Sequence, residues 1–516
     1  MIPAAKLPSF SPREEIAPAT IALPAALRRW NVRTAVLITG ATLVRLLLIA
    51  TTEIANGEAY YYVWSRFPAL SYYDHPPLIA WLTWLTTQYS HSSFAIRFGP
   101  VVYSAVFGVL IYRLAARLFT PRAGFIAVAI VTAMPVFLVS NFVLNPESPL
   151  APLWVLGLLL LEGMREHDES WRPLAAGLVI GLAFLAKYSG VVLGAVALLY
   201  IIVSPQARRW LKRPSFYLGG LVSLVVALPV VVWNYQRHWP SLVLHFVERT
   251  GPTGVSTWAV NAYHAILGQF GPFHPLMFPG LLVVLAIAIR RSRQDDRYRF
   301  LALASWPVLL FFLLMMVRVR DPEFHWTMVG YIPLAVAAGG LLDEVLDHPP
   351  RALRAYLAAC VGVSLAIIVG MYAYSQNRGL RRFIPASAYD TNRDFFNEMA
   401  GWSELKAAVD ESAAKLGRNT VVAAPQYALC SHILTALDDR PRVYCPSSRR
   451  TEFDFIARRD PPQGVPVLYI TDDHYHDDPA QLLPDRNCQP QRVVSIQRDG
   501  LLLQNYKLWA CLPRGG

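Results

Sequence analysis

Two carboxylates and a histidine lie in the first loop between apolar runs, and their setting favours chemistry. Glu58 stands early in this loop, and Asp74 and His75 directly precede the pair Pro76-Pro77. Charged groups at membrane depth are costly unless they are paired or functional. Because two prolines forbid a continuing helix and favour extended backbone before them, we expect Asp74 to be a rigidly held carboxylate at a membrane surface.

The same loop is crowded with aromatic residues, among them Tyr60 and Tyr61, and it also carries Arg66. An aromatic-rich segment of this kind suits an amphipathic helix that lies in the membrane interface. The alternative is an aromatic belt in which the charges are incidental. Both interpretations stay open on the loop alone.

A lysine interrupts one of the apolar stretches. Residues 174–203 are too long for a single span, and the sequence Lys187-Tyr188-Ser189-Gly190 divides them. We interpret this break as a tight turn between two helices. A lysine at such a place is costly unless it meets an anion, although its long side chain also allows it to snorkel to the interface.

The composition places the chain in a membrane. Hydrophobic residues make up 54% of its 516 residues and charged residues 16%, whereas about a quarter of a soluble domain is charged. The net charge of +12 does not indicate a nucleic-acid partner, because Lys and Arg cluster between apolar runs, as the positive-inside rule predicts. The Pro-rich segment 1–33 lacks the apolar core of a cleaved signal peptide, so the first apolar run is expected to be an uncleaved signal-anchor.

The apolar runs predict a polytopic α-helical membrane protein with about 11 transmembrane helices, since a helix needs about 20 apolar residues to cross a bilayer. We expect a cytoplasmic segment at 1–33, a transmembrane domain at 34–374 with an outer loop at 53–92, and a C-terminal domain at 375–516. The runs lie near 34–52, 93–116, 123–144, 150–164, 174–186, 190–203, 216–233, 275–289, 300–317, 327–342 and 355–374.

The arginines indicate the orientation. With the N-terminus in the cytoplasm, most Lys and Arg residues before residue 375 fall in inside segments, and an odd number of spans then places the C-terminal domain outside, beside the outer loop. The inside clusters lie near 28–33, 113–122, 165–172, 208–213, 290–299 and 351–354.

The C-terminal region has the character of a small α/β or α+β domain. Short strand-like runs occur at 465–470, 491–496 and 501–505. An even set of cysteines in an extracytoplasmic domain favours two disulfides. The simplest pairing is Cys430 with Cys445 and Cys488 with Cys511, although three pairings are possible and free thiols remain open.

Several motifs, taken in order, resemble those of GT-C superfamily glycosyltransferases. Glu58 with its aromatics, followed by the stretch from Asp74 through Leu78, resembles the signature after the first span of these proteins. The nearest branch is family 39/83, which includes protein O-mannosyltransferases and the lipid A aminoarabinose and galacturonic acid transferases. The later motifs that share the resemblance are Asn145-Pro146-Glu147-Ser148-Pro149-Leu150, Phe184-Leu185-Ala186-Lys187-Tyr188-Ser189, the segment from Pro229 to Trp239, and His325-Trp326.

The resemblance implies a GT-C fold and a transferase that uses a polyprenyl (undecaprenyl) phosphate-linked sugar as donor. It implies an inverting transfer to a lipid A or lipopolysaccharide-type glycolipid, in the cell inner (plasma) membrane with the C-terminal domain in the periplasm. One alternative is a protein O-mannosyltransferase-like enzyme, and another is a transporter of lipid-linked sugar, which is disfavoured because no internal repeat is visible.

Site roles follow from this resemblance. Asp74 and Glu58 are expected to be catalytic, with a carboxylate taking the proton of a hydroxyl acceptor. Lys187 is expected to bind the donor phosphate as negative charge develops on it. Further phosphate candidates are Arg66, Arg237 and His245, and the other expected site-lining residues are His75, Tyr60, Tyr61, Glu147 and His325.

One departure from the family pattern concerns the first acid. Family members usually have Asp-Glu where this chain has Gly57-Glu58, so Glu58 or Asp74 takes over, the acceptor needs no base, or activity is impaired. No cofactor is expected, and no metal, because the His- and Asp-rich run at 472–478 has the character of a solvated loop. There is no Gly-rich loop for a nucleotide-sugar donor.

Overall fold

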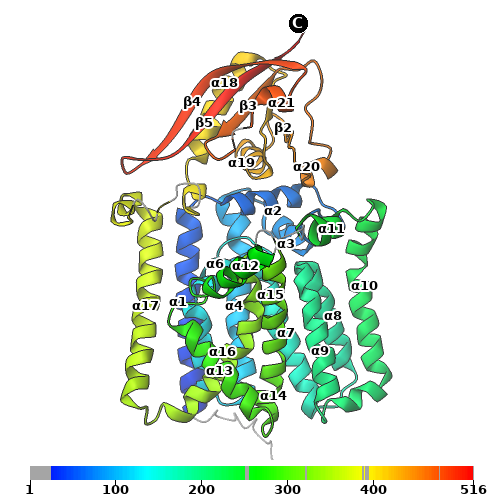
Figure 1. The fold of residues 1–516 in the computed structure, drawn as a ribbon, viewed down its shortest axis with the longest axis vertical. Helices are drawn as coiled ribbons and strands as arrows, with labels where there is room; N and C mark the ends of the chain where they lie inside the picture. The colour runs from blue at the N-terminus through cyan, green and yellow to red at the C-terminus, as the bar shows by residue number, and fades with distance from the viewer. Residues whose placement is uncertain are drawn as a thin grey trace, which may run out of the picture.

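The computed structural model describes residues 25–249, 255–319, 322–385, 389, 394–475 and 477–514. A tall bundle of helices forms most of the molecule, and a small α/β domain covers one end of it (Figure 1). The outer-loop helix α2 runs across that end, between the bundle and the sheet (Figure 1).

Within the described residues, seven helical segments are long and apolar enough to cross a membrane, where the apolar runs predicted about 11. The other runs form shorter helices, and the runs at 123–144 and 300–317 are each divided between two helices. The long segments are α1 (Ala25–Thr51), α4 (Ser93–Leu118), α7 (Glu147–Glu166), α10 (Pro214–Gln236), α14 with α15 (Asp296–Leu303 and Trp306–Arg318), α16 (Met328–Val345) and α17 (Arg351–Gln376).

Shorter helices complete the bundle. The predicted break at Lys187 is present as a 3-10 turn, Tyr188–Gly190, between α8 and α9. Helices α8 and α10 touch through glycines, since a Cβ on Gly177 would lie 1.9 Å from the carbonyl oxygen of Gly219. The shorter helices are α3 (Leu78–Thr86), α5 (Pro121–Ala133), α6 (Pro135–Ser140), α8 (Trp171–Ala186), α9 (Val191–Val203), α11 (Pro240–Val243), α12 (Val255–Leu267) and α13 (Met277–Arg291).

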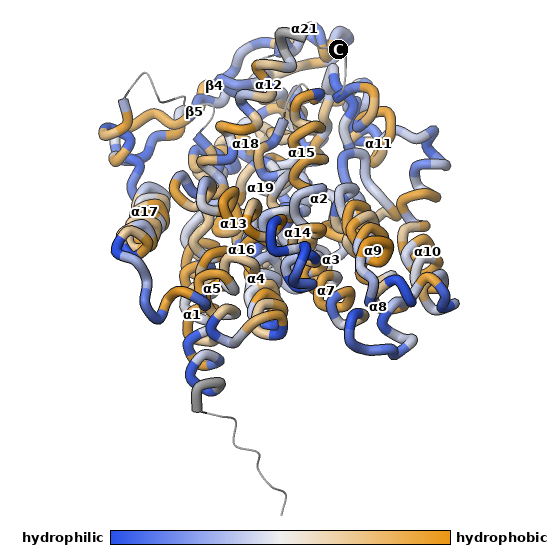
Figure 2. Tube along the Cα trace, turned by 60° about the horizontal axis from the view of Figure 1, so that its bottom comes forward, coloured by the Kyte–Doolittle hydropathy of each residue, from blue (hydrophilic) through white to orange (hydrophobic). Residues whose placement is uncertain are grey.

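Arginines tie the helices together at the end away from the sheet. Arg213 donates a hydrogen bond to the carbonyl oxygen of Asp168 at 2.8 Å, and Arg122 pairs with Asp347 at 2.6 Å. Figure 2 shows hydrophilic loops gathered at this end and apolar helices above them. The segments that the charge pattern assigned to one face therefore do lie together.

Helix α2 (Asn56–Arg66) is the amphipathic helix predicted in the outer loop. It begins where the Glu58 carboxylate accepts a hydrogen bond from the backbone N–H of Ala55 at 2.7 Å, a cap that satisfies an otherwise free donor. Its Val63 and Trp64 side chains are fully buried. Both belong to a buried cluster that also contains residues of the C-terminal domain.

The C-terminal domain contains a five-stranded sheet in the order β2-β1-β3-β5-β4. The first three strands are parallel and the long β4–β5 hairpin is antiparallel. The strands are β1 (Val421–Ala423), β2 (Val443–Tyr444), β3 (Val467–Asp472), β4 (Arg486–Arg498) and β5 (Leu501–Pro513), and the helices are α18 (Trp402–Leu416), α19 (Tyr427–Leu437), α20 (Glu452–Phe455) and α21 (Pro479–Leu482).

Two disulfides lie in this domain, between Cys430 and Cys445 and between Cys488 and Cys511. These are the pairs taken as simplest from the sequence. The first joins α19 to the segment after β2, and the second joins neighbouring strands β4 and β5.

The domain and helix α2 share one hydrophobic core. Ala59 and Val63 of α2 pack in the same buried cluster as Leu405, Ile433 and residues of the sheet. A polar contact adds to it, because Arg66 at the end of α2 pairs with Asp438 at 2.7 Å. The outer loop is therefore held from above by the domain as well as from below by the bundle.

Candidate active site

A cavity of about 650 Å³ lies where helix α2 meets the ends of α7, α8, α10 and α15. Part of its wall is charged and polar, and the remainder is apolar. The ionisable side chains that line it are Glu58, Tyr61, His75, Glu147, Lys187, Tyr188, His245, Arg249, Glu323 and His325.

Lys187 reaches this cavity from the break between α8 and α9. Its ammonium group forms an ion pair with Oε1 of Glu147, at the first turn of α7. The same oxygen accepts a hydrogen bond from Nε2 of His325 at 2.9 Å. The structure therefore brings together three of the residues predicted to form the site, each from a different element.

Glu58 also lines the cavity, but its carboxylate is fully occupied. Oε1 accepts hydrogen bonds from Nε of Arg97 at 2.7 Å and from the backbone N–H of Leu144 at 2.8 Å. Oε2 accepts from the N–H of Ala55 and from Nη2 of Arg97. Glu58 and Arg97 are both buried to the full extent. Through these contacts Glu58 joins α2, α4 and the segment before α7, and its expected catalytic role stays a prediction.

Asp74 is set back from the cavity wall. Its Oδ2 accepts a hydrogen bond from the Tyr60 hydroxyl at 2.8 Å, on the side of α2 that faces the C-terminal domain. Burial raises the pKa of Asp74, while the Tyr60 hydrogen bond and the charges of Arg449 and Arg249 oppose the rise. Among the described residues the cavity lining includes neighbouring His75 and not Asp74, so the expected convergence of Asp74 with Lys187 is indirect.

Two histidines connect Asp74 to the cavity. Nε2 of His245 donates a hydrogen bond to the carbonyl oxygen of Asp74 at 2.9 Å, and the His75 ring lies 6.3 Å from the His245 ring. Burial lowers the pKa of His245 to about 4, and it lowers the pKa of His75 as well. Both imidazoles are therefore neutral near pH 7.

Three other predicted site residues lie outside the cavity lining that the described chain forms. Arg66 pairs with Asp438, and its Nη1 also bonds the Tyr62 hydroxyl at 2.9 Å. Arg237 stacks over the ring of Trp233 at 4.8 Å. Tyr60 faces the C-terminal domain, whereas its neighbour Tyr61 does line the cavity. Neither arginine is placed to meet a phosphate inside the cavity.

Arg249 also lines the cavity, although it was not among the site residues predicted from the sequence. It directly follows the π-helical segment Leu244–Glu248, which carries His245. A basic residue in an outer loop was the signal available in the sequence. Glu323, two residues before His325, also lines the cavity.

The rest of the cavity wall is apolar and continues onto the outer surface of the bundle. Phe184, Val191, Val231 and Phe311 line it, and the last three are 58%, 43% and 45% exposed. Side chains that are exposed on this part of a membrane protein face lipid. The cavity thus has the form needed for a molecule with a charged head and a long apolar tail.

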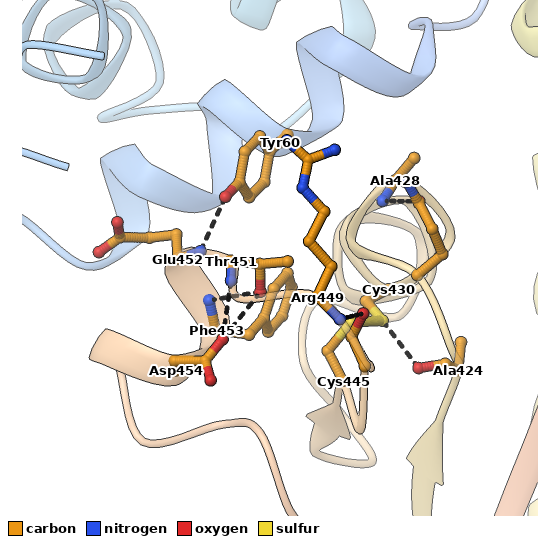
Figure 3. The surroundings of a disulfide bond; sticks show 12 residues. Tyr60, Ala424, Ala428, Cys430, Cys445, Arg449, Thr451, Glu452, Phe453 and Asp454 are labelled. Atoms are coloured by element: carbon orange, nitrogen blue, oxygen red, sulfur yellow. Dashed lines mark hydrogen bonds between the residues drawn. A yellow bond between two sulfur atoms is a disulfide. The ribbon is translucent and has the colours of Figure 1, made fainter. Parts of the chain in front are cut away.

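The C-terminal domain holds the outer loop through a short segment next to a disulfide. The N–H of Glu452 donates to the Tyr60 hydroxyl at 2.8 Å, and the Glu452 carboxylate accepts from the N–H of Tyr73 at 2.7 Å. Figure 3 shows the Tyr60–Glu452 contact near the Cys430–Cys445 bond, with Arg449 extending toward α2. The domain therefore contacts the backbone directly before Asp74 and the Tyr60 hydroxyl that bonds the Asp74 carboxylate.

No group of three His, Cys, Asp or Glu side chains suited to a metal was found in the described part of the chain. In the run at 472–478, Asp472 accepts hydrogen bonds from the backbone of His474 at 2.9 Å and from that of Tyr475, and Asp473 bonds Asn505 at 2.8 Å. His476 lies outside the described residues. The acidic side chains of this run thus serve its own turn and the neighbouring strand.

Comparison with solved structures identifies the fold. The crystal structure of ArnT from Cupriavidus metallidurans bound to undecaprenyl phosphate superposes with a TM-score of 0.60, covering 92% of this chain and 97% of that chain at 17% identity. The chain has a GT-C fold. The prediction of a helical GT-C domain followed by a small C-terminal sheet domain is therefore confirmed in its architecture.

Sequence comparison shows that the chain is similar to curated sugar transferases. The family model for dolichyl-phosphate-mannose-protein mannosyltransferase matches residues 74–233. Lipid A galacturonosyltransferase RgtD of Rhizobium johnstonii is 30% identical over 314 residues, which are 59% of this chain and 64% of that protein. The undecaprenyl phosphate-alpha-4-amino-4-deoxy-L-arabinose arabinosyl transferase of Edwardsiella ictaluri is 24% identical over 333 residues, 59% of this chain and 56% of that protein. The matches thus span less than two thirds of these relatives.

Proposed function

We propose that this GT-C protein is a glycosyltransferase that moves a sugar from a polyprenyl-phosphate donor to a lipid A or lipopolysaccharide-type glycolipid. The observation that carries the proposal is the cavity, which joins a charged and polar region containing Lys187 and Arg249 to an apolar wall open toward lipid. A polyprenyl-phosphate sugar has this same division between a charged head and an apolar tail. The named activities of the two curated relatives are of the same class.

Lys187 and Arg249 are the cations proposed to meet the donor phosphate. Both line the cavity, and Lys187 enters it from the break between two spans, where a charged group is retained only with a partner or a function. A phosphate leaving group gains negative charge in the transition state, and fixed cations stabilise that charge. Glu147 holds the Lys187 ammonium group in place until the donor arrives.

The proposed reaction is a single displacement that inverts the anomeric carbon. The acceptor oxygen forms a bond to C1 of the sugar, and the bond between C1 and the phosphate oxygen breaks. The electron pair of that bond stays on the polyprenyl phosphate, beside the two cations. Such a displacement needs the acceptor on the face of the sugar opposite the phosphate.

The proposed location is the inner membrane, with the cavity and the C-terminal domain on the periplasmic side. The arginine-rich loops lie at the opposite end of the bundle from the domain (Figure 1), and arginine-rich loops remain in the cytoplasm. This orientation places the sugar donor head and the glycolipid acceptor at the same outward surface.

The purified protein in liposomes tests the proposal directly. With undecaprenyl-phosphate-linked galacturonic acid or aminoarabinose as donor and lipid A as acceptor, we expect sugar-modified lipid A by mass spectrometry, and loss of the product with Lys187→Ala. A serine- and threonine-containing peptide replaces lipid A in a parallel reaction. Modified peptide with unmodified lipid A would move the assignment to protein glycosylation, and movement of intact donor across the bilayer without transfer would refute the enzyme.

A further inference from the structure

We propose that His325, oriented by Glu147 and Glu323, is the general base that takes the proton of a hydroxyl acceptor. This inference rests on the proposed function and names a reacting residue for it. A general base for this reaction must line the cavity and carry a free proton-accepting atom.

Glu58 is excluded by its hydrogen bonds. Arg97 and two backbone N–H groups supply four donors to its two oxygens. Protonation of this carboxylate would break the only charge pairing recorded for Arg97 among the described residues, and an unpaired buried charge is strongly unfavourable. A proton from the acceptor therefore has no suitable place on Glu58.

The two inner histidines are poor bases. Nε2 of His245 is used by the carbonyl oxygen of Asp74, and burial holds its pKa at about 4. His75 is more deeply affected, because burial and the charge of Lys187 both lower its pKa. A base is efficient when its pKa lies near the working pH, so neither ring fits the role.

His325 has the arrangement that a general base requires. Its Nε2 lies 2.9 Å from Oε1 of Glu147 and 3.3 Å from Oε2 of Glu323. Because two carboxylates contact Nε2, this nitrogen carries the proton of the neutral ring. Nδ1 is then the atom that can accept a proton. Within the described part of the chain, Nδ1 of His325 has no recorded hydrogen-bond partner, and the side chain is 32% exposed.

The segment that carries His325 is anchored from behind. It belongs to the 3-10 turn Phe324–Thr327, and the Thr327 hydroxyl donates to the Gln269 side chain at 2.6 Å. Both Thr327 and Gln269 are buried. A base held on a rigid support keeps its orientation during the reaction, which distinguishes His325 from a mobile surface histidine.

The proposed step transfers one proton and exchanges one bond at C1 of the sugar. The acceptor hydroxyl gives its proton to Nδ1 of His325 while its oxygen bonds to C1 of the sugar. The C1–phosphate bond breaks, and its electron pair remains on the phosphate near Lys187 and Arg249. The imidazolium is stabilised by Glu147 and Glu323 and later releases its proton to water.

Gly57 allows a test by substitution, because there is room for a side chain at its position. It lines the cavity on α2, and a Cβ built there would meet only the Tyr61 ring, at 4.0 Å. The Tyr61 hydroxyl lies in the field of Glu147 and Glu323, whose charges add to burial in raising the pKa of Tyr61. A carboxylate introduced by Gly57→Asp therefore enters the same region of the cavity without displacing other groups.

The experiment uses full-length protein in liposomes with the donor and acceptor that the parent uses. We expect His325→Ala to lower kcat by about 100-fold or more, as general-base losses do, while the dissociation constant for undecaprenyl phosphate changes little. Exposed His348→Ala, on the far side of the bundle, is the matched control and should behave as the parent.

Rescue distinguishes a base from a structural residue. His325→Ala with Gly57→Asp should regain at least about tenfold in kcat, whereas His325→Ala with Gly57→Asn, of nearly equal size, should not. If His325→Ala stays within tenfold of the parent, the nucleophile is already anionic and the inference is overturned. Equal rescue by Asp and Asn also overturns it. A parent that transfers no sugar from any polyprenyl-phosphate donor would instead refute the proposed function.

Discussion

Arg97 and Glu58 form a two-point ion pair in which neither side chain is exposed to solvent. Nε of Arg97 donates to Oε1 of Glu58 at 2.7 Å, and Nη2 donates to Oε2. Arg97 belongs to the first turns of α4, and Nη1 bonds the Thr52 hydroxyl at 2.8 Å. The pair thus joins the end of α1, helix α2 and helix α4 at one point beneath the outer loop.

Breaking this pair should destabilise the protein strongly. For Arg97→Ala we expect a loss of about 3–5 kcal/mol, since removing one member of a buried pair leaves the other charge uncompensated. Thermal unfolding in detergent at equal protein concentration measures the effect.

Lys415→Ala is the control for this prediction. Lys415 and Glu411 form an exposed pair of 2.7 Å within α18, and exposed pairs of this kind contribute little to stability. If Arg97→Ala unfolded at the same temperature as the control, the assigned role of the Glu58–Arg97 pair would be wrong.

Lys187→Ala should weaken binding of undecaprenyl phosphate by about 10- to 150-fold, because a hydrogen bond to a charged group contributes about 1.5–3 kcal/mol. Lys187→Arg keeps the charge and should lose less. Arg237→Ala provides a matched comparison, since Arg237 stacks on Trp233 outside the cavity lining and should change the affinity by less than about threefold. Equal losses for Lys187→Ala and Arg237→Ala would contradict the placement of the phosphate. Isothermal titration with the lipid in detergent provides the measurement.

The disulfide next to the Tyr60–Glu452 contact should matter for activity as well as stability. Replacing Cys430 and Cys445 by serine opens a loop of 15 residues, which corresponds to about 3 kcal/mol in the loop-entropy account. It also loosens the segment that carries Glu452, so we expect kcat to fall in the liposome assay.

The second disulfide serves as the control for the first. Cys488 and Cys511 connect adjacent strands away from α2, and their replacement by serine should lower the unfolding temperature while leaving kcat near that of the parent. If both double variants reduced kcat equally, the link between the first disulfide and the outer loop would be unsupported.

Stability of the domain contact should depend on pH through Glu398. Its Oε2 accepts from the N–H of Asn56 at 3.0 Å, and burial, with the charges of Glu58 and Asp394, raises the pKa of Glu398 to about 7. A raised pKa means that the folded state holds the proton more tightly. The contribution of Glu398 to stability is therefore complete below about pH 4.5 and is lost as the pH rises through about 7.

We accordingly expect the unfolding temperature of the parent to fall between about pH 5 and pH 8, and Glu398→Gln to show a smaller fall. Asp74 and Glu452 have pKa values raised in the same direction by burial, so part of the slope should remain in the variant. A slope identical in parent and Glu398→Gln would contradict the assignment.

Much of the architecture could be predicted from the sequence, because a helix needs about 20 apolar residues to cross the lipid bilayer. Each predicted run falls mainly on one helix or on two consecutive helices, the break at Lys187 is a turn, and the strand-like runs near 465–470 and 501–505 lie in β3 and β5. The arrangement of the arginines grouped the loops correctly. These features depend on the apolar and basic composition of long segments, and that composition can be read from one sequence.

The detailed roles of the charged residues were harder to predict, since they depend on partners distant in sequence. Glu58 and Asp74 look equivalent in the loop sequence. In the structure, Arg97 pairs with Glu58, whereas Asp74 accepts a hydrogen bond from Tyr60 on the side that faces the sheet. Glu147 and His325 are 178 positions apart and share a hydrogen bond. The sequence pattern placed these groups on one face of the membrane but did not specify their pairing.

The core shared by α2 and the C-terminal domain limits how such proteins can be recombined. Val63 and Ile433 belong to one buried cluster, so a transplant of the domain alone would leave an apolar helix surface uncovered in water. A chimaera between relatives should therefore exchange residues 56–77 together with the domain. In engineering terms, the exchangeable unit is discontinuous in sequence, although it is continuous in space.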